Sequence, residues 1–191
     1  MEFFEPKTTP DVNVRELLRY AGAKGDTTLD SLISDVISEA DELLSYRVIY
    51  LTLPVVIEGD TVKLGALSTS SGDLRKNLLG CSRAIIFGAT VGSGIDRLIT
   101  KYGRLSPSRA LLLQAYGSER IESLCDCFCA FLTEKTGKTL RPRFSCGYGD
   151  LPLDFQRDVF ALLDCKRIGL TLNESLSMSP SKSVTAIVGL N

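Results

Sequence analysis

The chain has 191 residues, of which 44% are hydrophobic and 24% charged, so residues 1–191 suit a single domain with a sizeable core. The formal net charge is −1 and no block of Lys or Arg occurs, which excludes an extended nucleic-acid surface. No apolar run is long enough to span a bilayer and the N-terminus lacks the basic start of a secretory signal, so we expect a cytoplasmic protein without membrane association.

Two helices are predicted at the start of the chain. Asn13 or Asp11 can cap a short helix over residues 14–21, and residues 24–28 read as a polar turn. A longer helix follows over residues 29–44, because apolar residues recur there with a period of 3.6.

Strands with a tight turn are predicted next. Residues 47–56 are rich in β-branched and aromatic side chains, and residues 58–60 separate them from a second short strand at 62–64. Residues 74–79 suit a short helix, and residues 84–89 read as a buried strand.

A glycine-containing loop over residues 90–94 joins that buried strand to a helix predicted over residues 95–102. The loop lacks the Gly-Lys-Ser/Thr ending of a nucleotide triphosphate loop, and its glycines have the wrong spacing for a dinucleotide fingerprint. We therefore interpret it first as a strand-to-helix turn, with a backbone that lines part of a ligand cleft as the alternative.

Ser106 and the proline after it predict the start of a long helix over residues 107–135, with a break near Gly117 as one option. Glu122 lies off the apolar stripe of this helix and could face a cleft. The stripe itself contains Ile121, Leu124, Cys125, Phe128 and Leu132.

The last elements are a strand over residues 140–145, a helix over 156–163 and a closing strand over 183–190. Strands and helices do not alternate regularly along the chain. The sequence therefore predicts an α+β architecture, with several helices and a mixed, mostly antiparallel sheet.

The six cysteines raise the question of a metal site. Cys125, Cys127 and Cys129 lie in a strongly helical pattern, where the first and third share a face and the second points away, so their thiolates cannot converge on one metal. We expect reduced, structural thiols and no metal. The chain also has no histidine, which removes the usual general base and every Ser/His or Cys/His nucleophile, so no catalytic residue is assigned.

Residues 143–150, with the sequence RFSCGYGD, combine a cation, an aromatic ring between two glycines and a carboxylate. Gly147 and Gly149 can take positive φ and leave the backbone bare beside Tyr148, so the turn can approach a ligand closely. Arg143 offers a fork of donors that suits a carboxylate or phosphate. The plainer alternative is a tight turn whose arginine pairs with a surface acid.

A long ordered series follows this turn: Pro152-Leu153 and Gln156, then Asn173-Glu174-Ser175, Met178 with Pro180, and Lys182-Ser183-Val184. Together with the turn, the series resembles the activation domain of cobalamin-dependent methionine synthase. The similarity is closer still to stand-alone proteins that carry this domain alone. It is strong over residues 141–190 and weaker upstream.

The resemblance implies S-adenosylmethionine as the ligand, and it implies roles for five residues. Arg143 matches the family arginine that binds the ligand's carboxylate, and the peptide at Phe144 would supply backbone hydrogen bonds. Gly147 belongs to the same motif, and Tyr148 matches a tyrosine at the mouth where the methyl group meets the corrin ring. Glu122 matches an acid that pairs with the ligand's ammonium.

The implied function is that of an accessory component in methionine biosynthesis, inactive alone, which positions S-adenosylmethionine for reductive remethylation of cobalamin. Cobalamin would be held only by a partner, either a truncated methionine synthase or another corrinoid protein, with flavodoxin or another reductant as electron donor. The alternatives are a non-catalytic module that binds the ligand or a corrinoid protein, and a reactivator of another corrinoid methyltransferase.

Three departures from the family pattern bear on the site. Cys146 stands where proline is usual, which leaves the turn less rigid and places a thiol near an alkyl donor. Asn173 replaces a threonine, and residues 186–188 replace aromatic residues of the full-length synthases. The last change predicts a missing ring contact and weak affinity for S-adenosylmethionine.

Overall fold

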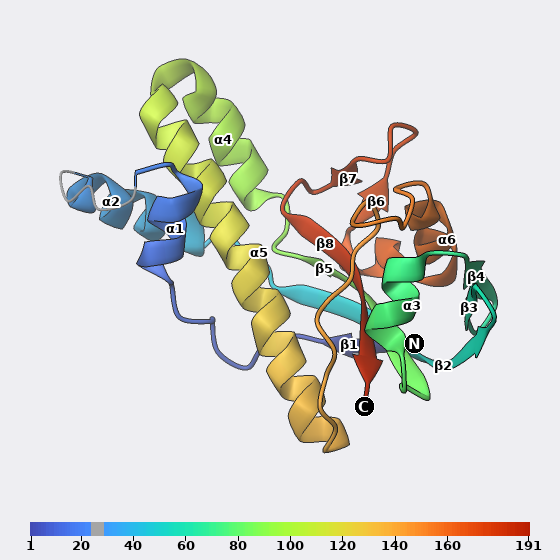
Figure 1. The fold of residues 1–191 in the computed structure, drawn as a ribbon. Coiled ribbons are helices and arrows are strands. Elements are labelled where there is room, and N and C mark those ends of the chain that lie inside the picture. Colours follow the sequence, from blue (N-terminus) through green and yellow to red (C-terminus); the bar gives the residue numbers. More distant parts are fainter. Residues whose placement is uncertain (24–28) are drawn as a thin grey trace.

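The computed structural model describes residues 1–23 and 29–191, and it has an α+β fold with helices on both faces of one antiparallel sheet (Figure 1). The strand order is β4-β3-β2-β5-β8, with β1 beside β2, and every pairing in the described residues is antiparallel. The α+β prediction is confirmed, whereas no parallel pair of the expected mixed sheet occurs among these residues. The strands of this sheet are β1 (Glu2–Phe4), β2 (Arg47–Glu58), β3 (Thr61–Leu64), β4 (Leu67–Thr69), β5 (Arg83–Thr90) and β8 (Ser183–Leu190).

The helices and a small separate hairpin surround the sheet. The helices are α1 (Val14–Tyr20), α2 (Asp30–Asp41), α3 (Gly72–Leu78), α4 (Gly94–Leu105), α5 (Pro107–Thr136), α6 (Phe155–Leu162) and the 3-10 helix η1 (Cys165–Ile168). The hairpin pairs β6 (Thr171–Leu172) with β7 (Met178–Ser179). None of the helices in the described part of the chain is long and apolar enough to cross a membrane.

Most elements predicted for the first half of the chain are confirmed. The side chain of Asn13 caps α1 by accepting a hydrogen bond from the Glu16 amide. The turn between β2 and β3 contains Gly59 at φ +57°, a conformation that glycine adopts without a steric penalty. The polar turn predicted at residues 24–28 lies outside the described residues.

The sheet separates two apolar cores. Side chains that alternate along each central strand point to one core or the other, so each strand contributes residues to both. On β2, Val48 and Tyr50 face the core formed with α1, α2, α4 and α5, whereas Ile49 faces the core formed with α3, α6 and η1. On β5, Phe87 and Ile86 divide in the same way. Because successive side chains of a strand point to opposite faces, an apolar run is needed where both faces are covered.

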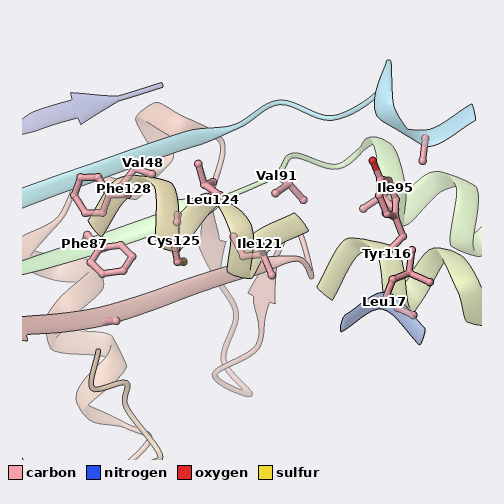
Figure 2. Packing of buried hydrophobic residues seen from close by; sticks show 14 of the residues in the cluster. Leu17, Val48, Phe87, Val91, Ile95, Tyr116, Ile121, Leu124, Cys125 and Phe128 are labelled. Atoms are coloured by element: carbon pink, nitrogen blue, oxygen red, sulfur yellow. The ribbon is translucent and has the colours of Figure 1, made fainter. Parts of the chain in front are cut away.

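Helix α5 is continuous, so the break considered at Gly117 does not occur. A Cβ atom at Gly117 would lie 2.8 Å from Cγ of Lys182 and 2.9 Å from Cδ1 of Ile95, so the glycine allows close packing. Further along α5 the predicted apolar stripe is buried against the sheet, where Phe128 packs edge-on against Phe87 (Figure 2).

A buried ion pair ties the N-terminal segment to α5. Arg120 is 0% exposed and Glu119 is 2% exposed, with 2.5 Å between Nε of Arg120 and Oε2 of Glu119. Arg120 also donates to the carbonyl oxygens of Pro10 and Asp11, and the Asn13 amide donates to Glu119. Every partner of the two charges is thus supplied within the protein, which is what a buried pair requires.

The strand predicted over residues 140–145 is reduced to two isolated bridges, Leu140 with Leu190 and Phe144 with Ile187. Pro142 lies between them and has no N–H to donate, so a continuous ladder cannot form beside β8. The segment still runs along β8, because Arg141 and Phe144 both donate backbone hydrogen bonds to it.

The glycines of the loop at residues 90–94 are explained by packing within the protein. A Cβ atom at Gly94 would lie 2.1 Å from the carbonyl oxygen of Leu43, and one at Gly92 would lie 2.2 Å from Oγ of Ser45. The loop therefore behaves as the strand-to-helix turn that was predicted first. None of its residues lines the cleft described below.

Two glycines of α4 provide a matched test of this packing. A Cβ atom at Gly103 would meet nothing within 4 Å, so we expect Gly103→Ala to raise the free energy of unfolding by up to about 1 kcal/mol through helix propensity. We expect Gly94→Ala to lower it by more than about 1 kcal/mol, because a backbone carbonyl blocks the new methyl group. Urea unfolding of both variants measures the difference, and equal effects would contradict the packing role of Gly94.

Candidate functional site

A cleft of about 630 Å³ lies where α5, the turn after Arg143, α6 and the start of β8 meet. Four of the five predicted site residues line it: Glu122, Arg143, Phe144 and Tyr148. Gly147, the fifth, lies beside Tyr148 in the turn but is not among the lining residues. The structure therefore brings together residues that lie up to 26 positions apart in the sequence, counted from 122 to 148.

Arg143 is held between two carboxylates of α5. Its Nη2 lies 2.7 Å from Oε2 of Glu122 and its Nη1 lies 2.5 Å from Oδ1 of Asp126. Burial alone would lower the pKa of Arg143, but the hydrogen bond and charge of the neighbouring acids outweigh it and raise the pKa. The guanidinium is thus a permanent cation, and the three groups together carry a formal charge of −1.

Asp126 was not singled out from the sequence. It lies four residues after Glu122, so both carboxylates project from the same side of α5, and this spacing is the signal that could have revealed it. The Asp126 side chain is 75% exposed, compared with 44% for Glu122 and 27% for Arg143. Glu122 is the one of the two acids that lines the cleft.

The backbone of Phe144 is already paired with β8. Its N–H donates to the carbonyl of Ile187 over 2.9 Å, and its own carbonyl accepts from the Ile187 N–H over 2.8 Å. The Phe144 N–H therefore has a partner within the protein, so any backbone hydrogen bond that this residue supplies to a ligand would come from its carbonyl. What Phe144 offers the cleft is its ring and the second lone pair of its carbonyl.

Tyr148 stands at the edge of the cleft in a turn that glycines make possible. Gly147 and Gly149 have φ values of +85° and +54°, and Tyr148 between them is 71% exposed. The turn is closed by backbone hydrogen bonds from Gly147 to the Leu151 carbonyl and from Leu151 to the Tyr148 carbonyl. The closed turn fixes the backbone at Tyr148, and its side chain is exposed at the edge of the cleft.

Asp150 fastens this turn to the N-terminus of α3. Its carboxylate accepts hydrogen bonds from the Ser71 hydroxyl, from the Gly72 amide over 2.7 Å and from the Asp73 amide over 3.1 Å. These contacts satisfy amides that a helix start leaves without a partner, and they lower the pKa of Asp150, with the Ser71 hydrogen bond as the largest cause. The sequence showed the carboxylate but not its partner 79 positions away.

The change in the closing strand leaves the cleft wall intact. Ala186 and Val188 are buried in the core beneath α5, and Ile187 is buried in the core beneath α6. The part of β8 that lines the cleft is residues 183–185. The predicted loss of a ring contact therefore concerns positions that pack inside this protein.

The cysteines form no metal centre. All six are free thiols, and the described residues contain no group of His, Cys, Asp and Glu side chains arranged to hold a metal ion. Cys125 is buried in the main core, and Cys146 is a buried residue of the cleft wall. Burial raises the pKa of Cys146 to about 11.

A second cleft, of about 640 Å³, lies beside α6, η1 and β6. It contains none of the five predicted site residues, and among the residues that the structure describes none of its lining side chains belongs to an ion pair. Functional clefts combine apolar walls with a few convergent polar groups, which describes the cleft at Arg143 better. We therefore take the cleft at Arg143 as the candidate site.

The fold is similar to that of solved structures. One is the crystal structure of the MetH reactivation domain bound to AdoHcy, with a TM-score of 0.66 and 16% sequence identity over 93% of this chain and 73% of that chain. The sequence matches no known protein-family profile and no curated protein. At this identity the likeness establishes the fold, and this chain has the α+β fold of the methionine synthase reactivation domain.

The Asp150 anchor predicts a pH dependence. Because the folded-state pKa of Asp150 is lowered, its carboxylate stabilises the folded protein above the unfolded pKa of about 3.9, and the stabilisation is lost as the pH falls through the folded value. We expect Asp150→Asn to have a lower free energy of unfolding than the wild type at pH 7. The difference between the two proteins should become smaller as the pH falls below about 4. Urea unfolding between pH 3 and pH 7 measures it.

The matched control is Asp164→Asn, since the Asp164 side chain makes no capping hydrogen bond at η1. The anchor is contradicted when Asp150→Asn and Asp164→Asn follow the same stability profile against pH.

Proposed function

We propose that this chain binds S-adenosylmethionine in the cleft at Arg143 and presents the methyl group to a corrinoid carried by a partner protein. Three observations support the proposal. The fold is that of a reactivation domain, and the similar structure holds AdoHcy, which is the demethylated form of this ligand. The cleft also combines a guanidinium, a carboxylate and an exposed aromatic ring.

The observation that carries the proposal is the pairing of Arg143 with Glu122 inside the cleft. An amino-acid ligand brings one carboxylate and one ammonium, so it can take the place of the pair, carboxylate to Arg143 and ammonium to Glu122. Each charge then exchanges one partner for another, and no charge is left without a partner in a partly buried site. A guanidinium can also bind the carboxylate through two parallel hydrogen bonds.

The surplus negative charge of the site suits the rest of the ligand. Arg143, Glu122 and Asp126 sum to −1, and S-adenosylmethionine is a zwitterion with an additional sulfonium charge, so the loaded site approaches neutrality. Tyr148 at the edge of the cleft offers the face of its ring to a cation, a contact that favours the sulfonium over the neutral thioether.

The reaction that we propose needs no acid or base from this chain. A cobalamin held by the partner, once reduced by one electron from cobalt(II) to cobalt(I) by flavodoxin or another donor, would supply the nucleophile for the methyl group. The sulfur would keep the electron pair of the broken bond. The chain's residues hold the ligand, orient the methyl group outward and exclude water. The absence of histidine is compatible with this role.

The partner is either a cobalamin-dependent methionine synthase that lacks this domain or another corrinoid methyltransferase. The local chemistry is the same for both. Tyr148 and Leu153 are exposed apolar residues at the cleft, and they form the surface that such a partner would meet.

Ligand binding tests the site directly. We expect Arg143→Ala to weaken S-adenosylmethionine binding by about 1.5 to 3 kcal/mol, or roughly 10-fold to 150-fold, because a charge-assisted pair is lost. The affinity of Arg143→Lys should lie between those of the wild type and Arg143→Ala, since lysine keeps the positive charge but lacks the planar guanidinium. Titration calorimetry measures the three affinities.

Arg104→Ala is the control, because it removes the same charge from an exposed position at the end of α4. A wild type that shows no binding at millimolar ligand, or an Arg143→Ala variant with unchanged affinity, would remove the donor site from consideration.

Methyl transfer tests the role of the exposed ring. With cobalamin bound to a corrinoid protein and a chemical reductant, we expect wild-type protein to support methylation from labelled S-adenosylmethionine. Tyr148→Ala should lower the transfer rate at least about 10-fold while its ligand affinity changes less, because the ring lies at the mouth of the cleft. Ligand binding without any transfer would favour a non-catalytic binding module.

A further inference from the structure

Gln156 is a buried polar side chain that the proposed site does not yet use. It lies in the first turn of α6, is 4% exposed, and lines the same cleft as Arg143. It is also the last residue of the Pro152-Leu153-x-x-Gln156 series in the sequence. A side-chain amide is costly to bury unless its hydrogen-bonding groups find partners.

The hydrogen bonds of Gln156 within the protein are incomplete. Its Nε2 donates to the carbonyl of Leu176 over 3.3 Å. In the part of the chain that the structure describes, this is the one hydrogen bond that the Gln156 side chain makes to a protein group, and it involves neither Oε1 nor the second N–H of Nε2. An amide has two donors and an acceptor with two lone pairs, so most of its capacity remains for a molecule in the cleft.

The carbonyl that holds Gln156 belongs to an unusual backbone position. Leu176 has φ +62°, a left-handed conformation that is strained for a non-glycine residue. The conformation is held by a closed loop, in which the Leu176 amide donates to the Asn173 carbonyl and the Ser177 amide donates to Oδ1 of Asn173. Strain of this kind persists only where the surrounding contacts determine it, and here it directs a carbonyl at Gln156.

The Leu176 carbonyl fixes which way the amide points. A carbonyl accepts hydrogen bonds and cannot donate them, so the nitrogen of Gln156 must stay on its side and Oε1 must stay on the other. The free edge therefore offers one acceptor next to one donor, in a fixed order. This order matches the edge of adenine, whose exocyclic amino group donates and whose adjacent ring nitrogen accepts.

We propose that Gln156 recognises the adenine base of the ligand, with Oε1 accepting from the amino group and Nε2 donating to the neighbouring ring nitrogen. The inference rests on the proposed function, since it assumes an adenosyl ligand whose amino-acid end is at Arg143. The base and the amino-acid end of the ligand would be bound by different elements. Gln156 of α6 would contact the base and Glu122 of α5 the ammonium, and both residues line the same cleft. Gln156 is then a determinant of base specificity.

The test compares two thioethers that differ only in the base, S-adenosylhomocysteine and S-inosylhomocysteine. In the second, a carbonyl oxygen replaces the amino group and would face Oε1 of Gln156, which cannot turn its nitrogen toward it. We expect wild-type protein to bind the adenosyl compound roughly 10-fold to 100-fold more tightly, as is typical of a two-bond contact between an amide and adenine. Titration calorimetry measures both affinities.

Two variants of similar size separate recognition from packing. Gln156→Met loses the acceptor, so the two ligands should bind within about 3-fold of each other. Gln156→Glu keeps an acceptor for the amino group and should still prefer the adenosyl compound by about 10-fold or more. Both variants lose the hydrogen bond to Leu176, so the loss of that bond alone cannot explain a difference between them.

Asn173→Ala is the control for the loop itself, because it removes the Oδ1 that holds Ser177 and lies outside the cleft lining. Because this loop orients the Leu176 carbonyl that holds Gln156, the variant should lower the preference for the adenosyl base without abolishing it, since the Gln156 amide itself is kept. Equal binding of both ligands by wild-type protein, or a preference retained in Gln156→Met, would overturn the role of Gln156 and leave the proposed function standing. No binding of either ligand would overturn both.

Discussion

The site depends on the pairing of β8 along both of its edges. One edge forms a continuous antiparallel ladder with β5, from Ser183 opposite Thr90 to Leu190 opposite Arg83. The other edge holds the segment that carries Arg143, through the bridges at Leu140 and Phe144. The strand fixes the position of Arg143 relative to the sheet. Glu122 and Asp126 of α5 then form ion pairs with the Arg143 guanidinium. A change in the register of β8 by one residue would exchange its two faces and displace both walls of the cleft.

The charge of Arg143 is satisfied within the protein, and the ligand that we propose would exchange places with its partners. A guanidinium without a partner in a half-buried position would be costly, so the two acids of α5 satisfy it when no ligand is bound. The exposed part of these pairs limits what they contribute, because solvent-accessible ion pairs stabilise a fold by only about 0 to 1 kcal/mol. The protein would therefore lose little if the zwitterionic ligand that we propose replaced them. Apolar side chains at this position could pack closely, but they could not bind a zwitterionic ligand.

Local patterns in the sequence predicted much of the fold, because helices and strands follow from residues close together in the chain. The caps and periods around Asn13 and along α5 were sufficient for these helices, and four of the five residues predicted around the Arg143 motif line one cleft. What escaped prediction arises from contacts between distant residues. The partner of Asp150 is the start of α3, the glycine at 94 faces the Leu43 carbonyl, and the Phe144 peptide is taken by Ile187. No spacing rule encodes such pairs, since only the folded chain brings them together.

The thiol in the cleft wall raises the question of whether the protein would be alkylated by the ligand we propose. The nucleophile in such a reaction is the thiolate, and burial raises the pKa of Cys146 to about 11. At neutral pH roughly one thiol in ten thousand is then ionised. Burial also raises the pKa of Cys125 and of Cys129, although Arg143 opposes this rise at both thiols. We therefore expect none of the three thiols to compete with the proposed corrinoid for the methyl group. Replacement of the usual proline by cysteine at position 146 is therefore compatible with a methyl donor in this cleft, because the same burial that packs the side chain also suppresses its reactivity.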